Sequence, residues 1–322
     1  MRLARFAGWF AGALVVLALI AAALLFWASR SETVLRWGVD RFADRLPCRL
    51  QIDGLRGAIT EPLDIGRIVC ENDEYRVEAR AVRLEWAPWH LRQQRLRIVL
   101  LRAAFLEYVS KTEGGGAPDA LALPLTVDID SLEIEHLRVA DSEGALELRA
   151  LRAAYQGDAR MHRVTLQGIG ADWGSLQGDL TLGAAQPLPL EARLRASITA
   201  VDDWPIEAAI EVSGPLARPV AVVNGTARDM PFSAQLELTP FADAPVEALQ
   251  ARTDALDLAA LDARLPQTAL TVDLSARTPD LAAFAGTLSV TNPQPGPIDR
   301  NALPLAALQA RFSAGAGALE LT

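Results

Sequence analysis

The segments of this chain that come nearest to catalytic motifs are two glycine-containing stretches, and neither is complete. Ser175 follows Gly174, but Trp173 stands where a Gly-x-Ser-x-Gly nucleophile elbow needs its first glycine. The pair Gly168-x-Gly170 is followed by Gly174, one residue too late for the dinucleotide fingerprint, and the chain has no Walker loop. The sequence therefore predicts no nucleophilic serine, no dinucleotide cofactor and no ATP site.

The other residue types with catalytic or ligating capacity are scattered along the chain. His90, His136 and His162 lack metal-ligand spacing, so we expect surface or hydrogen-bonded structural histidines. The triplet Asn224-Gly-Thr226 matches a glycosylation acceptor, a match that is common by chance. Most Asp and Glu residues alternate with apolar ones, as on a solvated strand face. We therefore expect no enzyme, no metal site and no cofactor.

Cys48 and Cys70 are the two cysteines of the chain. In an oxidising compartment they could form a disulfide, and in the cytosol they would be two small buried apolar residues. The strand pattern places them on the first and third strands of a meander, which are not neighbours. This placement counts against the bond, so the sequence leaves the pairing open.

Charge is distributed unevenly along the 322 residues. Residues 1–110 hold 16 Arg and 12 acidic residues, net +4, and the remainder holds 15 basic and 28 acidic residues, net −13, which together give the total of −9. Anionic lipid would attract the basic portion. The acidic remainder argues against nucleic acid as a partner, because phosphate contacts need a basic face.

An apolar segment near the start of the chain predicts a membrane anchor. Phe6 to Trp27 comprises 22 uncharged residues, about 33 Å as a helix, which is enough to cross the hydrocarbon core of a bilayer. The segment is longer than the apolar region of a signal peptide, and Phe26-Trp27 lies where small residues should mark cleavage. We therefore predict an uncleaved transmembrane helix within residues 1–30. Arginines on both sides leave its orientation open under the positive-inside rule.

The segment that follows the anchor changes from a helical to a strand period. An amphipathic helix is expected over residues 31–47, and Pro47 would end it. From Cys48 the apolar period becomes two, so residues 48–112 are expected to form a first β segment, with a turn or short helical excursion over Pro88–Gln94.

The glycine-rich loop over residues 110–118 marks a sub-boundary, after which residues 113–322 continue the β pattern. A short helix is expected within Asp254–Leu265. The sequence stops at Thr322 in strand-like residues, so we expect the natural polypeptide to continue or to leave an open strand edge.

Strands with one polar and one apolar face recur along the chain. Leu190 and Leu194, for example, are separated by Glu191 and Arg193. The predicted fold is mainly β: a transmembrane helix, then an elongated, rolled antiparallel sheet forming an open groove, with short helical excursions. A closed sandwich or barrel would show the same alternation. The apolar side chains proposed to line a lipid groove are Leu125, Val127, Ile129, Leu132, Ile134, Leu188, Leu190, Leu194, Ile198, Ile206, Ile210, Val212, Leu236 and Leu238.

The order of elements resembles that of a known family. After the anchor and amphipathic helix come Ile52-Asp-Gly54-Leu-Arg-Gly57, Leu63-Asp-Ile-Gly66, the strand Val77–Trp86 and Pro88-Trp-His-Leu91, which leads into Leu96-Arg-Ile98. Later segments with a similar pattern are Gly286-Thr-Leu-Ser-Val-Thr-Asn-Pro293, Pro295-Gly296 and Ala302-Leu-Pro-Leu305. Each motif is degenerate, but their order resembles the start of the TamB family, the inner-membrane component of the bacterial translocation and assembly module, in the wider AsmA-like group.

This resemblance implies a single-pass inner-membrane protein whose body crosses the periplasm as a rolled sheet with an apolar interior. The family works with an outer-membrane barrel of the TamA type. The roles implied are phospholipid transport between the two membranes and assembly of outer-membrane proteins such as autotransporters. TamB proteins are far longer than this sequence, which lacks the C-terminal domain implicated in meeting the barrel, so barrel contact is assigned to no residue.

We therefore expect a membrane-anchored periplasmic conduit for phospholipid, linked to outer-membrane biogenesis. Exposing two 16-carbon acyl chains to water costs on the order of 25 kcal/mol at about 0.8 kcal/mol per CH₂, and an apolar trough would remove most of that cost. The alternative is a scaffold or chaperone for outer-membrane protein assembly and secretion, whose strand edges pair with incoming client strands. A passive tether is a third interpretation.

Overall fold

The computed structural model describes residues 48–111, 118–141, 144–199, 205–242, 244–262, 264–280, 283–315 and 318–321. The predicted anchor (1–30) and the predicted amphipathic helix (31–47) lie outside these residues. Within the described part of the chain, no helix combines the length and the apolar composition needed to cross a membrane.

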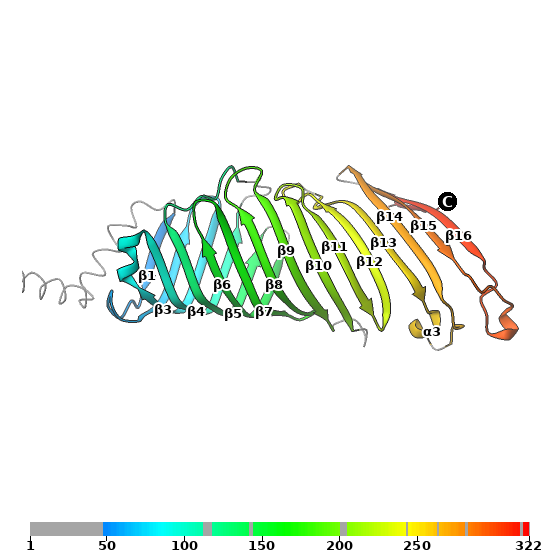
Figure 1. The fold of residues 1–322 in the computed structure, drawn as a ribbon, viewed down its shortest axis with the longest axis horizontal. Coiled ribbons are helices and arrows are strands. Elements are labelled where there is room, and N and C mark those ends of the chain that lie inside the picture. Colours follow the sequence, from blue (N-terminus) through cyan, green and yellow to red (C-terminus); the bar gives the residue numbers. More distant parts are fainter. Residues whose placement is uncertain are drawn as a thin grey trace, which may run out of the picture. The chain divides into compact units, whose positions relative to one another are not determined.

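The described chain is mainly β, and its seventeen strands belong to one long, open antiparallel sheet. The prediction of a mainly β, antiparallel fold is therefore confirmed. The chain divides into unit 1, Met1–Lys111 with Asp128–Leu146, and unit 2, Thr112–Val127 with Glu147–Thr322. Figure 1 shows the strands in chain-order colours.

Unit 1 contains five strands and one short helix. They are β1 (Arg49–Asp53), β2 (Leu63–Glu71), β3 (Tyr75–Ala87), η1 (Pro88–Gln93), β4 (Arg95–Ser110) and β5 (Thr126–Ala140). Strands β1 to β4 pair antiparallel in chain order. A buried apolar cluster holds them together, formed by Leu55, Ile65, Val82 and Ala103. The helical excursion predicted at Pro88–Gln94 is confirmed as η1, a 3₁₀ helix.

The cysteines are joined, and the expectation that they lie on separated strands was wrong. Cys48 directly precedes β1, and Cys70 lies on β2 opposite Leu50 of β1. Their Cα atoms are 5.5 Å apart and their sulfurs form a disulfide. Residues 54–62 connect the two strands as a loop, not as a further strand, which makes β1 and β2 direct neighbours.

Strand β5 belongs to unit 1, although the predicted boundary at residues 112/113 assigned it to the second segment. The first part of unit 1 ends at Lys111. Acidic side chains of β5 form ion pairs with basic side chains of β4. These ion pairs are Arg95–Asp128 at 3.0 Å, Arg97–Asp130 at 3.0 Å and Arg102–Glu133 at 2.6 Å.

The alternation of β5 changes parity in mid-strand. Its ion-paired acids are first even-numbered, Asp128 and Asp130, and then odd-numbered, Glu133. Strands β3 and β6 carry comparable interruptions, at Ala81 and Ala150, whose φ angles of 49° and 51° lie in the left-handed region. Such an irregularity shifts the side chains that follow to the other face. The groove candidates of β5 are therefore odd-numbered before the irregularity (Val127, Ile129) and even-numbered after it (Leu132, Ile134). All of them stay on the face opposite the ion pairs.

Unit 2 is an antiparallel meander in which each strand from β6 to β17 pairs with the next. Its strands are β6 (Ala145–Gly157), β7 (Met161–Ala171), β8 (Gly174–Gly183), β9 (Pro189–Ile198), β10 (Ile206–Pro215), β11 (Val220–Ala227), β12 (Met230–Leu238), β13 (Val246–Leu256), β14 (Leu270–Asp280), β15 (Ala283–Thr291), β16 (Ala307–Gly315) and β17 (Ala318–Leu321). Figure 1 shows β9 to β13 side by side.

Two short helices interrupt the meander, α3 (Leu258–Leu261) and η2 (Ile298–Arg300). The helix predicted within Asp254–Leu265 is reduced to α3, because β13 continues to Leu256. Asp257 caps α3 by accepting a hydrogen bond from the Ala259 amide at 3.1 Å.

Candidate functional site

The candidate functional site is an apolar face of unit 2 that continues from strand to strand. Antiparallel register places residues of ten consecutive strands, β7 to β16, in one row across the sheet. No member of this row is polar: Leu166, Gly178, Leu194, Ile210, Val223, Ala234, Ala251, Leu274, Leu288 and Ala310.

A second apolar row runs beside the first, two residues away on each strand from β7 to β16. Its members are Val164, Leu180, Ala192, Val212, Ala221, Leu236, Leu249, Ala276, Gly286 and Phe312. We call the two rows together the apolar face. Its continuity requires that the alternation stay in phase across each of these strand pairs, and the register shows that it does.

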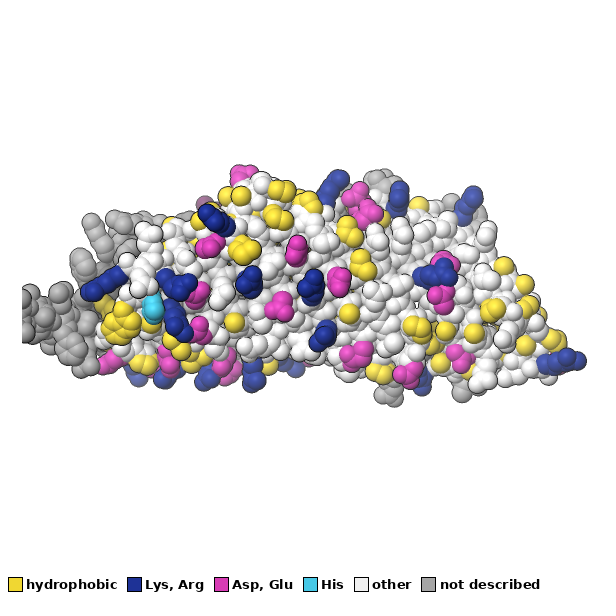
Figure 2. All heavy atoms as spheres, viewed as in Figure 1, with side chains coloured by type: hydrophobic (Ala, Val, Ile, Leu, Met, Phe, Trp, Pro, Cys, Tyr) yellow, Lys and Arg dark blue, Asp and Glu magenta, His cyan; other side chains and the backbone are white. Residues whose placement is uncertain are grey.

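The opposite face of unit 2 is polar in the same register. The row adjacent to the first apolar row consists of Thr165, Asp179, Arg193, Glu211, Val222, Gln235, Gln250, Ser275, Thr287 and Arg311. Val222 is its one apolar member. Figure 2 shows charged side chains of both signs spread over the visible surface of the sheet, with few hydrophobic ones between them. The sheet is therefore two-faced, as its alternating sequence predicts.

The apolar face is not sealed by a second layer of the described chain. Its large side chains, such as Leu194, Ile210 and Leu274, are half-buried, whereas the core of a closed sandwich would bury them fully. Among the described residues of unit 2, the fully buried apolar side chains are alanines except for Leu188 and Leu270. The buried apolar cluster of the described chain lies in unit 1 instead. Bulky apolar side chains of unit 2 thus stay accessible.

Four predicted groove residues belong to the two rows of the apolar face, Leu194 on β9, Ile210 and Val212 on β10, and Leu236 on β12. Register pairs Leu194 with Ile210, Ile198 with Ile206 and Leu190 with Gly214. All of the following are half-buried: Leu190, Leu194, Ile198, Ile206, Ile210, Val212, Leu236 and Leu238. The structure therefore brings these candidates together on one accessible surface.

The remaining candidates are placed differently. Leu188 is fully buried in the turn before β9, where its amide donates to Ala185 O and its carbonyl accepts from Leu216 N, so we correct its assignment to the groove. Ile134 of β5 is also buried, with 5 % exposure, in unit 1. Four further candidates are half-buried: Leu125 just before β5, Val127 and Ile129 near its start, and Leu132 in its middle.

Several residues of the apolar face were missing from the predicted set. They include Leu166, Val223, Leu249, Leu274 and Leu288. The same alternation that selected Leu194 would have found Leu166, Leu274 and Leu288, because each stands between polar neighbours in a strand-like segment. Val223 and Leu249 each have one apolar neighbour, Val222 and Ala248, so alternation alone marks them less clearly. Their alignment into rows, by contrast, depends on register, which the sequence does not display.

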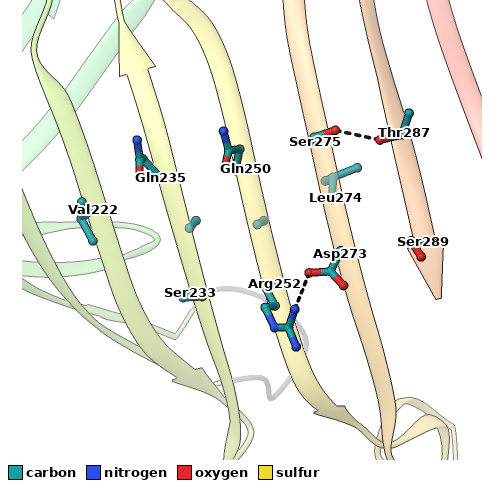
Figure 3. Close-up of a pocket in the computed structure, with 12 residues that line it drawn as sticks. Val222, Ser233, Gln235, Gln250, Arg252, Asp273, Leu274, Ser275, Thr287 and Ser289 are labelled. Atoms are coloured by element: carbon teal, nitrogen blue, oxygen red, sulfur yellow. Dashed lines mark hydrogen bonds and ion pairs between the residues drawn. The ribbon is translucent and has the colours of Figure 1, made fainter. Parts of the chain in front are cut away.

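The polar face holds a shallow hollow of about 440 Å³ over β11 to β15. Figure 3 shows two pairs of its polar side chains bonded to each other. Arg252 Nη1 donates to Asp273 Oδ1 at 3.0 Å, and the Ser275 and Thr287 hydroxyls lie 2.8 Å apart. Gln235 and Gln250 extend from neighbouring strands beside them. This hollow offers hydrogen bonding without an arrangement of nucleophile, base or metal ligands.

No family model, curated protein or solved structure matches this chain. The resemblance to the TamB family is thus carried by the order of the chain's own elements and stays a prediction. The binding chemistry of unit 2 is therefore inferred from the apolar face and the polar face of its sheet.

The histidines and the glycine considered for catalytic motifs have roles in packing and hydrogen bonding. His162 is buried, with Nδ1 2.7 Å from the Tyr155 hydroxyl and Nε2 2.9 Å from Leu121 O. His90 lies on η1 and His136 on β5, so the three histidines are on separate elements. At Gly174, a side chain would overlap the carbonyl oxygen of Ser197 on β9, so close strand packing accounts for this glycine.

The strongest electrostatic feature is a buried glutamate in unit 1. Glu78 of β3 is 1 % exposed, and its carboxylate accepts hydrogen bonds from Arg67 at 2.9 Å and from Arg76 and Arg80 at 2.7 Å. These bonds, that from Arg67 first, hold the pKa of Glu78 well below its ordinary value. The cluster joins β2 to β3, so its geometry indicates a structural role.

Proposed function

We propose that the chain is an apolar conduit for phospholipid acyl chains. The observation that carries this proposal is the first apolar row, which crosses ten strands without a polar residue. Ten strands about 4.8 Å apart give a surface roughly 43 Å across. An acyl chain lying on it would exchange water for aliphatic side chains, while its headgroup stays solvated.

The lack of specific bonds on the apolar face suits transport. Contacts between aliphatic groups are non-directional and scale with buried area, so a guest can slide from one strand to the next without breaking hydrogen bonds. Two 16-carbon acyl chains in water cost on the order of 25 kcal/mol at about 0.8 kcal/mol per CH₂. Shielding even part of that surface would lower the barrier to crossing an aqueous space.

The proposed location is the inner membrane, with the body in the periplasm. The predicted apolar segment at Phe6–Trp27 supports a membrane anchor. The bond between Cys48 and Cys70 supports an oxidising compartment for the body, because cytosolic thiols are kept reduced. An outer-membrane barrel of the TamA type remains the proposed partner on the basis of the family resemblance.

Two neighbouring valines of β11 provide a matched test. Val223 lies on the apolar face between Ile210 and Ala234, whereas Val222 points to the polar face and is 38 % exposed. We expect Val223→Glu to reduce bound phospholipid roughly 100-fold, because a charge in a hydrocarbon environment costs about 2.5–3.5 kcal/mol. Val222→Glu should leave occupancy unchanged. Native mass spectrometry of the detergent-extracted chain measures bound phospholipid directly.

Both variants should fold, since both side chains can reach water in the unoccupied protein, and thermal unfolding checks this. A photocrosslinker at Leu194, in the same row as Val223, should capture phospholipid in cells. Equal phospholipid occupancy in the two variants, together with no lipid captured at Leu194, would refute the conduit. If proline substitutions in an edge strand then abolished outer-membrane protein assembly, the scaffold alternative would replace it.

A further inference from the structure

The helix η1 presents unusually exposed apolar side chains. Trp89 is 63 % exposed, the highest value among the large apolar residues of the described chain, and Leu91 is 43 % exposed. The turn that carries them is fixed: Pro88 starts it, and the Gln94 amide donates to the carbonyls of His90 and Leu91. An indole and an isobutyl group are thus held out from the sheet in a defined conformation.

The charge around η1 differs from that of the rest of this acidic protein. Trp86 to Leu106 is a run of 21 residues that contains four arginines and no acid. Three of these arginines are ion-paired with β5. The fourth, Arg92, is exposed in the last turn of η1 and forms no ion pair with another described residue. Figure 2 shows hydrophobic and basic side chains close together at this end of unit 1.

We propose that Trp89, Leu91 and Arg92 form a second membrane contact, which docks unit 1 on the headgroup region of an anionic bilayer. Tryptophan is favoured at that depth because its ring is apolar and its N–H can still be hydrogen-bonded. A neighbouring leucine can enter the acyl boundary, and an arginine is attracted by anionic headgroups. A sheet body held by this contact would have its first strands at the lipid surface.

A bilayer fits this patch better than a protein partner does. The apolar patch consists of two side chains on a single helical turn, which is small against the roughly 800 Å² per partner of a standard protein interface. Its basic residue has no acidic neighbour within η1. Interfacial anchors of this kind work as short aromatic and aliphatic insertions with basic support, and they need no complementary pocket.

Trp173 provides the matched control. It is also an exposed tryptophan, at 39 %, but it lies in the turn between β7 and β8 next to Asp172. The full chain is reconstituted into vesicles of phosphatidylcholine with a minority of phosphatidylglycerol, with brominated phosphatidylcholine as a shallow fluorescence quencher. Trp89→Phe and Trp173→Phe are then compared with the unaltered chain.

We expect Trp89→Phe to remove roughly a quarter to a third of the quenchable fluorescence, with the predicted membrane segments supplying the rest. Trp173→Phe should leave the quenchable amplitude unchanged. Arg92→Glu should reduce quenching of Trp89 in anionic vesicles more than in vesicles of phosphatidylcholine alone. Equal quenchable amplitudes in the two tryptophan variants would overturn the proposal and leave the patch to a protein partner. The result does not depend on whether the apolar face carries lipid.

Discussion

Replacing Glu78 by alanine is expected to lower the free energy of unfolding of unit 1 by about 3 kcal/mol. The carboxylate is buried between three guanidinium groups that bond to it at 2.7–2.9 Å. Removing it would leave Arg67, Arg76 and Arg80 as like charges around an empty site. Breaking a buried pair in this way costs about 3–5 kcal/mol, and the lower end applies because the arginines remain partly exposed.

Glu85 of the same strand provides the control for this measurement. It pairs with Arg83 at 3.0 Å, but about a third of its side chain is exposed. Glu85→Ala should therefore cost less than about 1 kcal/mol, the usual value for an exposed pair. Denaturant unfolding of both variants gives the two free energies. If Glu78→Ala proved no more costly than Glu85→Ala, the cluster would not stabilise unit 1.

The contribution of Glu78 should also depend on pH in a defined direction. Its pKa is lowered in the folded state, chiefly by the hydrogen bond from Arg67, relative to an unfolded value of about 4.3. The stabilisation is therefore present in full above the unfolded pKa and is lost as the pH falls through the lower, folded pKa. The stability difference between the unaltered chain and Glu78→Gln should stay constant at neutral pH and shrink below about pH 4. Denaturant unfolding at a series of pH values measures this difference.

Period-two alternation was enough to predict the mainly β, antiparallel fold and one side of the candidate site. Leu194 and Ile210 were chosen because each lies in a strand-like segment that alternates apolar with charged residues, and the structure places them opposite each other on β9 and β10. Side-chain direction follows from strand geometry alone, so it can be read from one sequence. The helical excursion at η1 could be predicted for a similar reason, since proline and the break in alternation are local signals.

The parts that failed depend on contacts between residues far apart in sequence. Strand β5 joined unit 1 through ion pairs with β4, 31 to 33 residues away, which composition does not reveal. Leu188 matches the even-numbered alternation of β9, yet it lies in the preceding turn with a φ of 56° and is buried there.

Pairing of Cys48 with Cys70 was misjudged because strand neighbours depend on which segments become loops. Counting each alternating run as a strand separated the two cysteines by one strand too many. In the structure residues 54–62 carry Gly54 and Gly57 at positive φ, 68° and 108°, and turn the chain back so that β2 lies against β1. Local alternation cannot distinguish this turn from a short strand.

Replacing both Cys48 and Cys70 by serine is expected to lower the free energy of unfolding by about 3 kcal/mol, from the chain entropy of a 22-residue loop released in the unfolded state. Reductant should destabilise the unaltered chain by the same amount and leave the double variant unchanged, which separates the bond from the effect of the serines. Denaturant unfolding measures both.

The same cysteines report the compartment of the body. Protein taken from cells under acid quench should resist alkylation until it is reduced, because the bond persists in an oxidising compartment and not in the cytosol. Thiols that alkylate without reduction would contradict the periplasmic location while leaving the fold intact. The apolar face would then be open to the cytosol, so phospholipid transport between two membranes would require a different route.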